Sequence, residues 1–95
     1  MVYVDKFHYT KDSYGNELYI SEMKWTNTLS ENAYNRCTKA DMIKFINDNP
    51  GCAHTKYYRF GRWYDGEEIH VVDNSYLRTD KNNIKADNLE NLPRY

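Results

Sequence analysis

Several residue types that mark large protein classes are scarce in this sequence. Its 95 residues include two cysteines, two prolines and four glycines, and its basic and acidic residues balance to a formal net charge of −1. Two cysteines do not make a disulfide framework, and the four glycines form neither a G-x-x-x-x-G-K nor a G-x-G-x-x-G phosphate loop. The near-neutral charge gives no overall field that attracts nucleic acid or anionic lipid, so such binding would need a local patch.

Long hydrophobic runs are also absent. The N-terminal residues MVYVDKFHYTKD interrupt their apolar run with charges, unlike a signal peptide, and no stretch has the length that crosses a bilayer. We therefore expect a cytoplasmic protein with no membrane partner. Apolar residues make up 40% of the chain and aromatic residues 16%, far more than a disordered chain carries, so we expect one folded domain, residues 1–95.

The candidate metal ligands and nucleophiles are His8, His54, His70, Cys37 and Cys52. They do not follow a C-x₂-C or H-x₃-H spacing, which argues against a metal site. A cysteine and a histidine can act as nucleophile and base, but no catalytic signature flanks any of these residues. We therefore expect no metal, no cofactor and no enzymatic activity.

Residues 2–10 and 17–26 predict the two strands of an N-terminal hairpin. Aromatic and aliphatic residues are frequent in both, and Asp, Ser, Gly and Asn occupy the turn between them. In the second strand the apolar alternation changes side, and a bulge near Ser21–Glu22 would return it to one face. The polar residues 27–36 show no pattern and predict a loop.

Residues 39–48 predict a helix. Thr38 is a suitable N-cap, Asp41 follows at the third helical position, and Asn49-Pro50-Gly51 ends the helix. Apolar residues at helical spacing form one stripe on it. We expect this stripe, Met42, Ile43, Phe45 and Ile46, to pack on a sheet against Leu18, Ile69 and Val71.

Two further strands are predicted at 53–60 and 67–72. The turn between Gly61 and Gly66 would place Arg62 and Trp63 at its tip. The predicted order is β-β-α-β-β, an α+β fold with a mostly antiparallel sheet and one covering helix. The C-terminal segment is rich in turn residues, and we expect it to be anchored by Tyr76, Leu77, Ile84, Leu89 and Leu92.

The region from His54 to Tyr64 is the strongest candidate for a binding surface, because it interleaves basic and aromatic residues and contains no acid. Such side chains dominate protein–protein hot spots, and they also bind single-stranded nucleic acid by stacking and phosphate contacts. A third interpretation is an ordinary strand with Tyr58 and Phe60 in the core. The candidate binding residues are Lys56, Tyr57, Arg59, Arg62, Trp63 and Tyr64.

We favour a non-catalytic module that binds a host protein complex stoichiometrically, as an accessory protein of a bacterium or a phage. Eleven asparagines, with many lysines and tyrosines, are typical of an AT-rich genome such as that of a low-GC bacterium or its phage. The alternative is binding of single-stranded nucleic acid or a nucleotide signal through the predicted hairpin, residues 57–63.

The C-terminal segment carries a recognisable motif. Residues 76–80 read YLRTD, and residues 86–93 read ADNLENLP. This ending resembles the "YLRT…DNL…LP" signature of a small bacterial and phage family, the domain of unknown function 3892. The resemblance implies a hairpin, a short helix introduced by Ser or Thr, a second hairpin and this ending, and it implies no activity. The chain departs from the family's pattern in a longer loop at 27–36 and in Lys81-Asn82-Asn83, which replaces a shorter Asp-Gly-type turn.

Three polar residues of the motif, Arg78, Asp87 and Asn88, have two interpretations. Asp87 and Asn88 can bond their own backbone and hold a turn, with Arg78 paired to a nearby aspartate. Alternatively, the three residues form a second-choice ligand site. Turn-forming Asp and Asn residues beside leucine anchors are common, which favours the structural interpretation.

Overall fold

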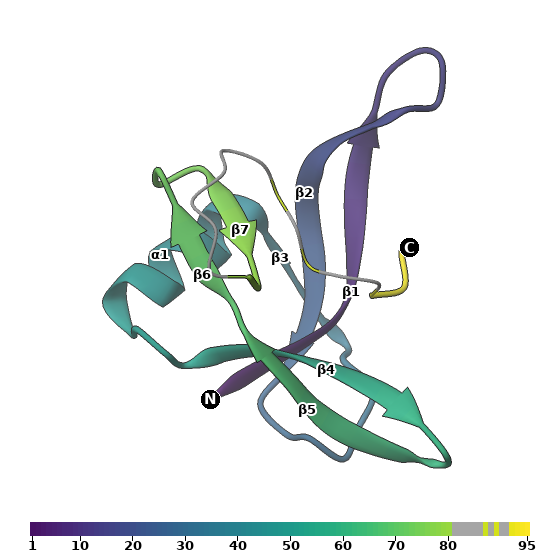
Figure 1. The fold of residues 1–95 in the computed structure, drawn as a ribbon, viewed down its shortest axis with the longest axis vertical. Helices are drawn as coiled ribbons and strands as arrows, with labels where there is room; N and C mark the ends of the chain where they lie inside the picture. Colours follow the sequence, from purple (N-terminus) through teal and green to yellow (C-terminus); the bar gives the residue numbers. More distant parts are fainter. Residues whose placement is uncertain (81–86, 88, 90–91) are drawn as a thin grey trace.

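The computed structural model describes residues 1–80, 87, 89 and 92–95, which form an α+β fold with a mainly antiparallel sheet and one helix (Figure 1). The expected fold class is confirmed. A five-stranded sheet has the order β3-β2-β1-β4-β5, and a two-stranded sheet pairs β6 with β7. The strands are β1 (Val2–Lys11), β2 (Glu17–Thr26), β3 (Asn35–Thr38), β4 (Ala53–Arg59), β5 (Arg62–Glu68), β6 (His70–Val72) and β7 (Tyr76–Arg78), and the helix is α1 (Lys39–Asp48).

Two boundaries differ from the sequence prediction. The expected loop 27–36 ends early, because residues 35–38 pair with β2 as the additional strand β3. The expected strand 67–72 is divided between β5 and β6, which belong to different sheets. The first difference arises because β3 pairs with β2 across the loop between them, which residue patterns within the loop do not encode. The second arises because β6 leaves the large sheet and forms a short hairpin with β7, in which Val72 lies opposite Tyr76.

The β1–β2 hairpin contains the predicted bulge. His8 lies opposite Glu22 and Tyr9 opposite Ile20, so the extra residue of β2 is Ser21. The bulge places Ile20 and Met23 on the same face, where both are fully buried. The expected packing of Leu18 against the helix is wrong, because this end of the hairpin extends beyond the helix and leaves Leu18 56% exposed (Figure 1).

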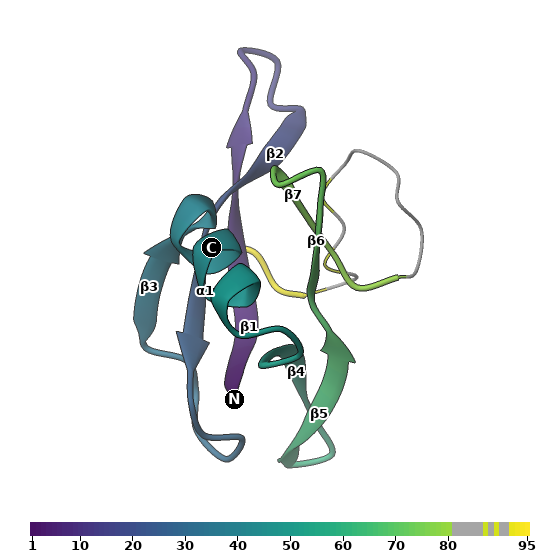
Figure 2. The same ribbon diagram turned by 90° about the vertical axis from the view of Figure 1, so that its left-hand side faces the viewer.

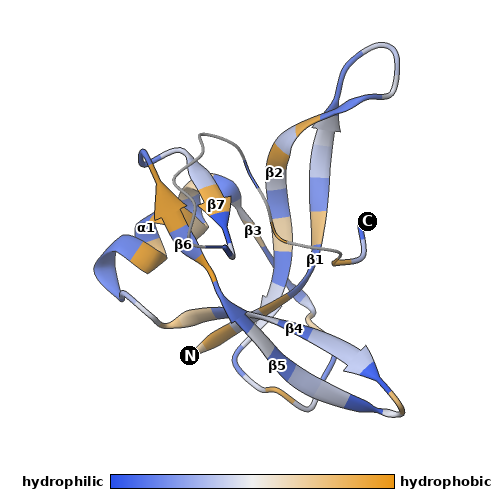
Figure 3. Cartoon of the chain, viewed as in Figure 1, coloured by the Kyte–Doolittle hydropathy of each residue, from blue (hydrophilic) through white to orange (hydrophobic). Residues whose placement is uncertain are grey.

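Helix α1 begins at the predicted cap, where the main-chain N–H of Asp41 donates to Thr38 Oγ1 at 3.2 Å. The helix contacts β2 and β3 of the large sheet and both strands of the small sheet (Figure 2). The helix, the small sheet and the middle of β2 bring hydrophobic residues together (Figure 3). Ile69 is buried in this core as expected, and Phe45 and Val71 are partly buried at its margin. The buried residues of the helix stripe are Met42, Ile43 and Ile46. No helix among the described residues has the length and apolarity needed to span a membrane.

Strands β1 and β4 are parallel neighbours for only three residues, Val2–Val4 with Ala53–Thr55. Beyond these pairs the strands diverge, and the β4–β5 hairpin leaves the direction of β1 (Figure 1). The C-terminal segment then pairs with β1, because the N–H of Phe7 donates to Pro93 O and the N–H of Tyr95 donates to Phe7 O, both at 3.1 Å. The predicted anchors Leu77, Leu89 and Leu92 are buried and Tyr76 is half-buried, whereas Ile84 lies outside the described residues.

Candidate functional site: the β4–β5 hairpin and its groove

The tip of the β4–β5 hairpin is formed by Phe60 and Gly61. Arg59 and Arg62 pair directly across it, which makes a two-residue turn, and both tip residues have positive φ, 54° and 77°. Positive φ at both central residues is the geometry that fits the twist of a hairpin. The predicted turn between residues 61 and 66 is therefore wrong, because strand pairing continues up to Arg62. Phe60 is 88% exposed, so it does not lie in the core.

Tyrosine and arginine side chains share one face of the hairpin. Tyr57 and Tyr64 lie opposite each other, with ring centroids 5.5 Å apart and an interplanar angle of 17°. The Arg59 guanidinium lies 5.4 Å from the centroid of the Tyr57 ring. In the part of the chain that the structure describes, neither Arg59 nor Arg62 has a salt-bridge partner. Both arginines are exposed, so their charges are available to another molecule.

Packed aromatic residues occupy the opposite face. Tyr58 and Trp63 meet edge to face, with centroids 5.2 Å apart, and the Lys56 ammonium lies 4.3 Å from the centroid of the Trp63 ring. Trp63 is only half-buried, but these two contacts make it a packing residue of the strand. The prediction that Trp63 stands at the hairpin tip is therefore wrong.

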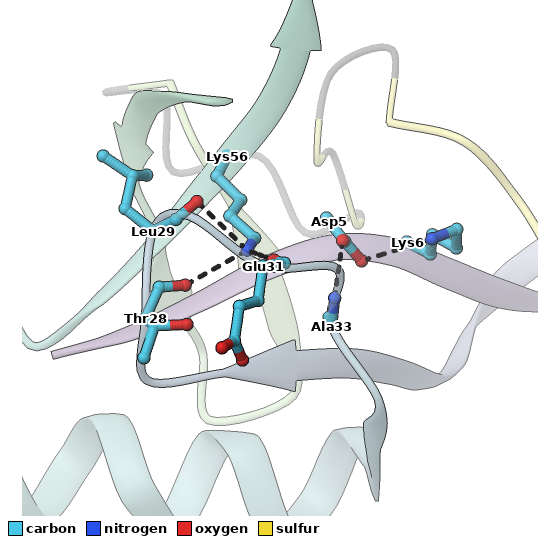
Figure 4. A network of polar contacts seen from close by, with 7 residues as sticks. All are labelled: Asp5, Lys6, Thr28, Leu29, Glu31, Ala33 and Lys56. Carbon is cyan, nitrogen blue, oxygen red and sulfur yellow. Dashed lines mark hydrogen bonds and ion pairs between the residues drawn. The ribbon is translucent and has the colours of Figure 1, made fainter. Parts of the chain in front are cut away.

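Lys56 is fully buried and fixes the loop that precedes β3 (Figure 4). Its Nζ donates to Thr28 O at 3.1 Å, to Leu29 O at 3.4 Å and to Glu31 O. Burial lowers the pKa of Lys56, with Asp5 acting in the opposite direction. The sequence placed Lys56 among the exposed candidate residues, but its ammonium faces the inside of the fold, because three carbonyl groups and the ring of Trp63 surround it.

A groove of about 630 Å³ opens where β4 diverges from β1. Its walls come from β1, β4, β5 and the C-terminal segment. One wall contains the Asp5 carboxylate, which is 2% exposed and accepts a hydrogen bond from the N–H of Ala33 at 2.9 Å. The groove is lined by Asp5, Lys6, Thr55, Lys56, Tyr57, Tyr58, Arg59, Trp63, Gly66, Glu67, Thr79, Leu92 and Pro93.

Comparison with known proteins identifies the family. The family model described as "Protein of unknown function (DUF3892)" matches residues 7–93. The chain belongs to the DUF3892 family. The resemblance expected from the YLRT…DNL…LP ending is therefore confirmed, and the match includes the β4–β5 hairpin of this DUF3892 protein. No curated protein and no solved structure matches the chain.

In this DUF3892 protein two of the second-choice ligand residues, Asp87 and Arg78, make hydrogen bonds within the fold. Asp87 Oδ2 accepts from the N–H of Ile20 at 2.8 Å and from Lys39 Nζ at 3.0 Å, and Oδ1 accepts from the N–H of Leu77 at 2.9 Å. Asp87 thus connects β2, β7 and α1 rather than bonding only to its own turn. Arg78 is buried and forms two hydrogen bonds with Asp80. Asn88 lies outside the described residues.

The cysteines of this DUF3892 protein are free and half-buried. Burial, followed by the nearby charges of Asp41 and Glu22, raises the pKa of Cys37 to about 11, so its thiol stays protonated at neutral pH. A protonated thiol is a poor nucleophile and metal ligand. Among the described residues, no group of three His, Cys, Asp or Glu side chains lies close enough to hold a metal ion.

Sequence reasoning missed Phe60 as the tip, although the sequence KYYRFGRWYD contains a signal for it. A two-residue turn at Phe60-Gly61 pairs arginine with arginine and tyrosine with tyrosine across the hairpin, as the structure shows. The second glycine of the region also has a different role. A Cβ atom on Gly66 would lie 2.3 Å from Thr55 Oγ1, so glycine there permits the close approach of β5 to β4 and does not form a turn.

Proposed function

We propose that this DUF3892 protein is a non-catalytic binding module that binds a larger protein through the end of the β4–β5 hairpin, with Phe60 as the anchor. In this proposal it acts as a bacterial or phage accessory protein on a host complex. The observation that carries the proposal is the combination of exposure and backbone conformation at Phe60. A large aromatic residue occupies a solvent-exposed position in the left-handed region of φ.

Folding does not explain this phenylalanine. The left-handed conformation costs a residue with a side chain about 1–2 kcal/mol, and asparagine or glycine at this turn position avoids most of that cost. Because the ring is 88% exposed, it gains little from burial within the chain. Residues that are both strained and exposed are concentrated at functional sites, and an aromatic anchor that enters a partner's pocket is a common form of such a site.

The residues around Phe60 fit a protein contact. Arg59 and Arg62 flank it with exposed guanidinium groups, and Tyr58 is 60% exposed beside them. Arginine and tyrosine are the types enriched at protein–protein hot spots. The two-residue turn and the paired rings behind it hold these side chains on a rigid element, which reduces the entropy lost on binding.

The nucleic-acid alternative has weaker support from this geometry. Stacking on a base needs an open ring face, and two of the candidate rings are less available, because Tyr57 and Tyr64 stack on each other and the Arg59 guanidinium lies over the Tyr57 ring. The exposed rings of Phe60 and Tyr58 are the ones that could stack on bases. Lys56 contributes no surface charge, because its ammonium is buried. Arg59 and Arg62 remain as phosphate contacts, so nucleic acid is retained as an outcome of the test.

The test compares three immobilised baits: the wild-type chain, Phe60→Asn and Tyr14→Ser. Tyr14 is a matched control, because it is 89% exposed near the tip of the other long hairpin and is not in the left-handed region. Each bait is incubated with lysate of the native host, with and without nuclease, and bound proteins are quantified by mass spectrometry. We expect wild type and Tyr14→Ser to retain the same stoichiometric protein, and Phe60→Asn to lose it by roughly tenfold or more.

Two results contradict the proposal. Equal retention by Phe60→Asn shows that Phe60 is not the anchor. Loss of all bound protein after nuclease treatment shows that nucleic acid makes the contact, and the alternative function then replaces the proposed one.

A further inference from the structure

We propose that the groove between β1 and β4 binds an extended, acidic segment of the partner protein, which adds a strand to the free edge of β4 and donates a main-chain hydrogen bond to Asp5. This inference rests on the proposed function, and it goes further by naming the chemistry of the bound segment. It depends on three observations made on the described residues: a strand edge that no described strand pairs, a buried acceptor that no described group donates to, and a basic rim.

The unpaired edge belongs to the outer half of β4. The N–H of Ile69 donates to Ala53 O, whereas the N–H of Val2 donates to Cys52 O, so odd-numbered residues of β4 face β5 and even-numbered residues face β1. This alternation directs the main-chain N–H and C=O of Tyr58 toward the groove. Among the described residues, no strand pairs with that side of β4 beyond Thr55. An extended peptide can supply the missing partner by adding a strand to the edge.

The buried acceptor is Asp5 Oδ1. The other carboxylate oxygen is bonded to the Ala33 N–H, but Oδ1 has no hydrogen-bond partner among the described residues and lies 3.8 Å from Lys6 Nζ. A buried polar atom without a partner is destabilising, and such atoms in native proteins call for an explanation. The charge of Asp5 already acts on the buried Lys56 ammonium, so Oδ1 needs a hydrogen bond from a neutral donor rather than a further cation. A peptide N–H is such a donor.

The rim of the groove is basic and its walls are partly apolar. Lys6 and Arg59 line it from β1 and β4, and Glu67 is the one exposed acid among its described lining residues. An acidic segment therefore complements the rim better than a basic one. Leu92 and Trp63 contribute apolar surface, against which alternate side chains of an extended peptide can pack.

The experiment uses a phage-displayed library of random dodecapeptides, selected on the wild-type chain. An enriched peptide is synthesised, and its Kd is measured by fluorescence polarisation for wild type, Asp5→Asn and Phe60→Asn. Asp48→Asn serves as a matched control, because Asp48 is an exposed aspartate on the helix. An asparagine at position 5 can keep the acceptor for the Ala33 N–H and place an NH₂ donor where Oδ1 lies, which opposes a donor from the peptide.

We expect enriched peptides to be acidic and to bind Asp5→Asn at least tenfold more weakly than wild type, with Asp48→Asn unchanged. Amide hydrogen exchange at Tyr58 should slow at least tenfold when the peptide is bound. Methylation of single peptide amide nitrogens should weaken binding at alternate positions, as pairing with one strand edge requires. The methylation and exchange measurements use the wild-type chain, so they stay decisive if Asp5→Asn does not fold.

The inference is overturned if no peptide is enriched, or if methylation has no alternating effect and exchange at Tyr58 is unchanged. Its failure is distinguishable from failure of the proposed function. If no peptide binds the groove but a host protein is still captured in a Phe60-dependent way, the groove inference is rejected and the proposed function stands. If a peptide binds wild type and Phe60→Asn equally, and no host protein is captured in a Phe60-dependent way, the role of Phe60 as the anchor is rejected and the groove inference stands.

Discussion

Replacing Phe60 with asparagine should stabilise the protein. The wild-type residue has φ of 54°, which costs about 1–2 kcal/mol for a residue with a side chain, and asparagine tolerates this conformation better. Little burial is lost with the ring, because Phe60 is 88% exposed. We therefore expect the free energy of unfolding to rise by about 1 kcal/mol, which corresponds to an increase in Tm of roughly 4–8 °C for a domain of this size.

Urea unfolding followed by circular dichroism measures this change, and two further substitutions separate its causes. Phe60→Ala removes the ring but keeps the Cβ atom, so the strain remains and stability should stay within about 0.5 kcal/mol of wild type. Phe60→Gly relieves the strain, but it adds about 0.5–1 kcal/mol of unfolded-state entropy, so its gain should be smaller than that of asparagine. If Phe60→Asn is no more stable than Phe60→Ala, the backbone at this position is not strained and the reasoning is refuted.

Three further predictions concern buried groups. Lys56→Met should destabilise the fold by roughly 3–5 kcal/mol, because it leaves three carbonyl groups unpaired, whereas Lys44→Met, at an exposed helix position, should be nearly silent in the same urea experiment. Asp87→Ala should cost roughly 2–5 kcal/mol through two unpaired N–H groups, against less than about 1 kcal/mol for Asp48→Ala. The raised pKa of Cys37 means that the unfolded state loses this proton first, so stability should fall as pH rises from about 9 toward about 11. Cys37→Ser should reduce that slope, and an unchanged slope contradicts the assignment.

The sequence predicted those parts of the fold that local patterns determine. The helix follows from its cap at Thr38 and its apolar stripe, and the bulge at Ser21 follows from the change of side in the alternation of β2. The turn of the first hairpin contains Asp12, whose carboxylate accepts from the N–H groups of Tyr14 and Asn16, so this turn is stabilised by its own residues.

Other features depend on contacts between distant residues, and the sequence did not predict them. In the sequence Lys56 resembles an ordinary surface lysine. It is buried because the fold brings the loop at 28–31 against it, and the carbonyl groups of this loop accept hydrogen bonds from its ammonium. The parallel pairing of β1 with β4 arises after the chain has passed through two strands and a helix. At the candidate site, one interpretation of the sequence placed Phe60 in the core, because an aromatic strand residue is usually buried, whereas the structure leaves Phe60 88% exposed at the hairpin tip.

The central claim is that Phe60 contacts a partner protein, and site-specific photo-crosslinking tests it most directly. The photoreactive amino acid p-benzoylphenylalanine replaces Phe60 in one variant and Tyr14 in another, and each variant is irradiated in cells of the native host. The account predicts one protein adduct from position 60 that survives nuclease treatment and is absent from position 14. A nucleic-acid adduct at position 60, equal protein adducts at both positions, or no adduct at position 60 would contradict it.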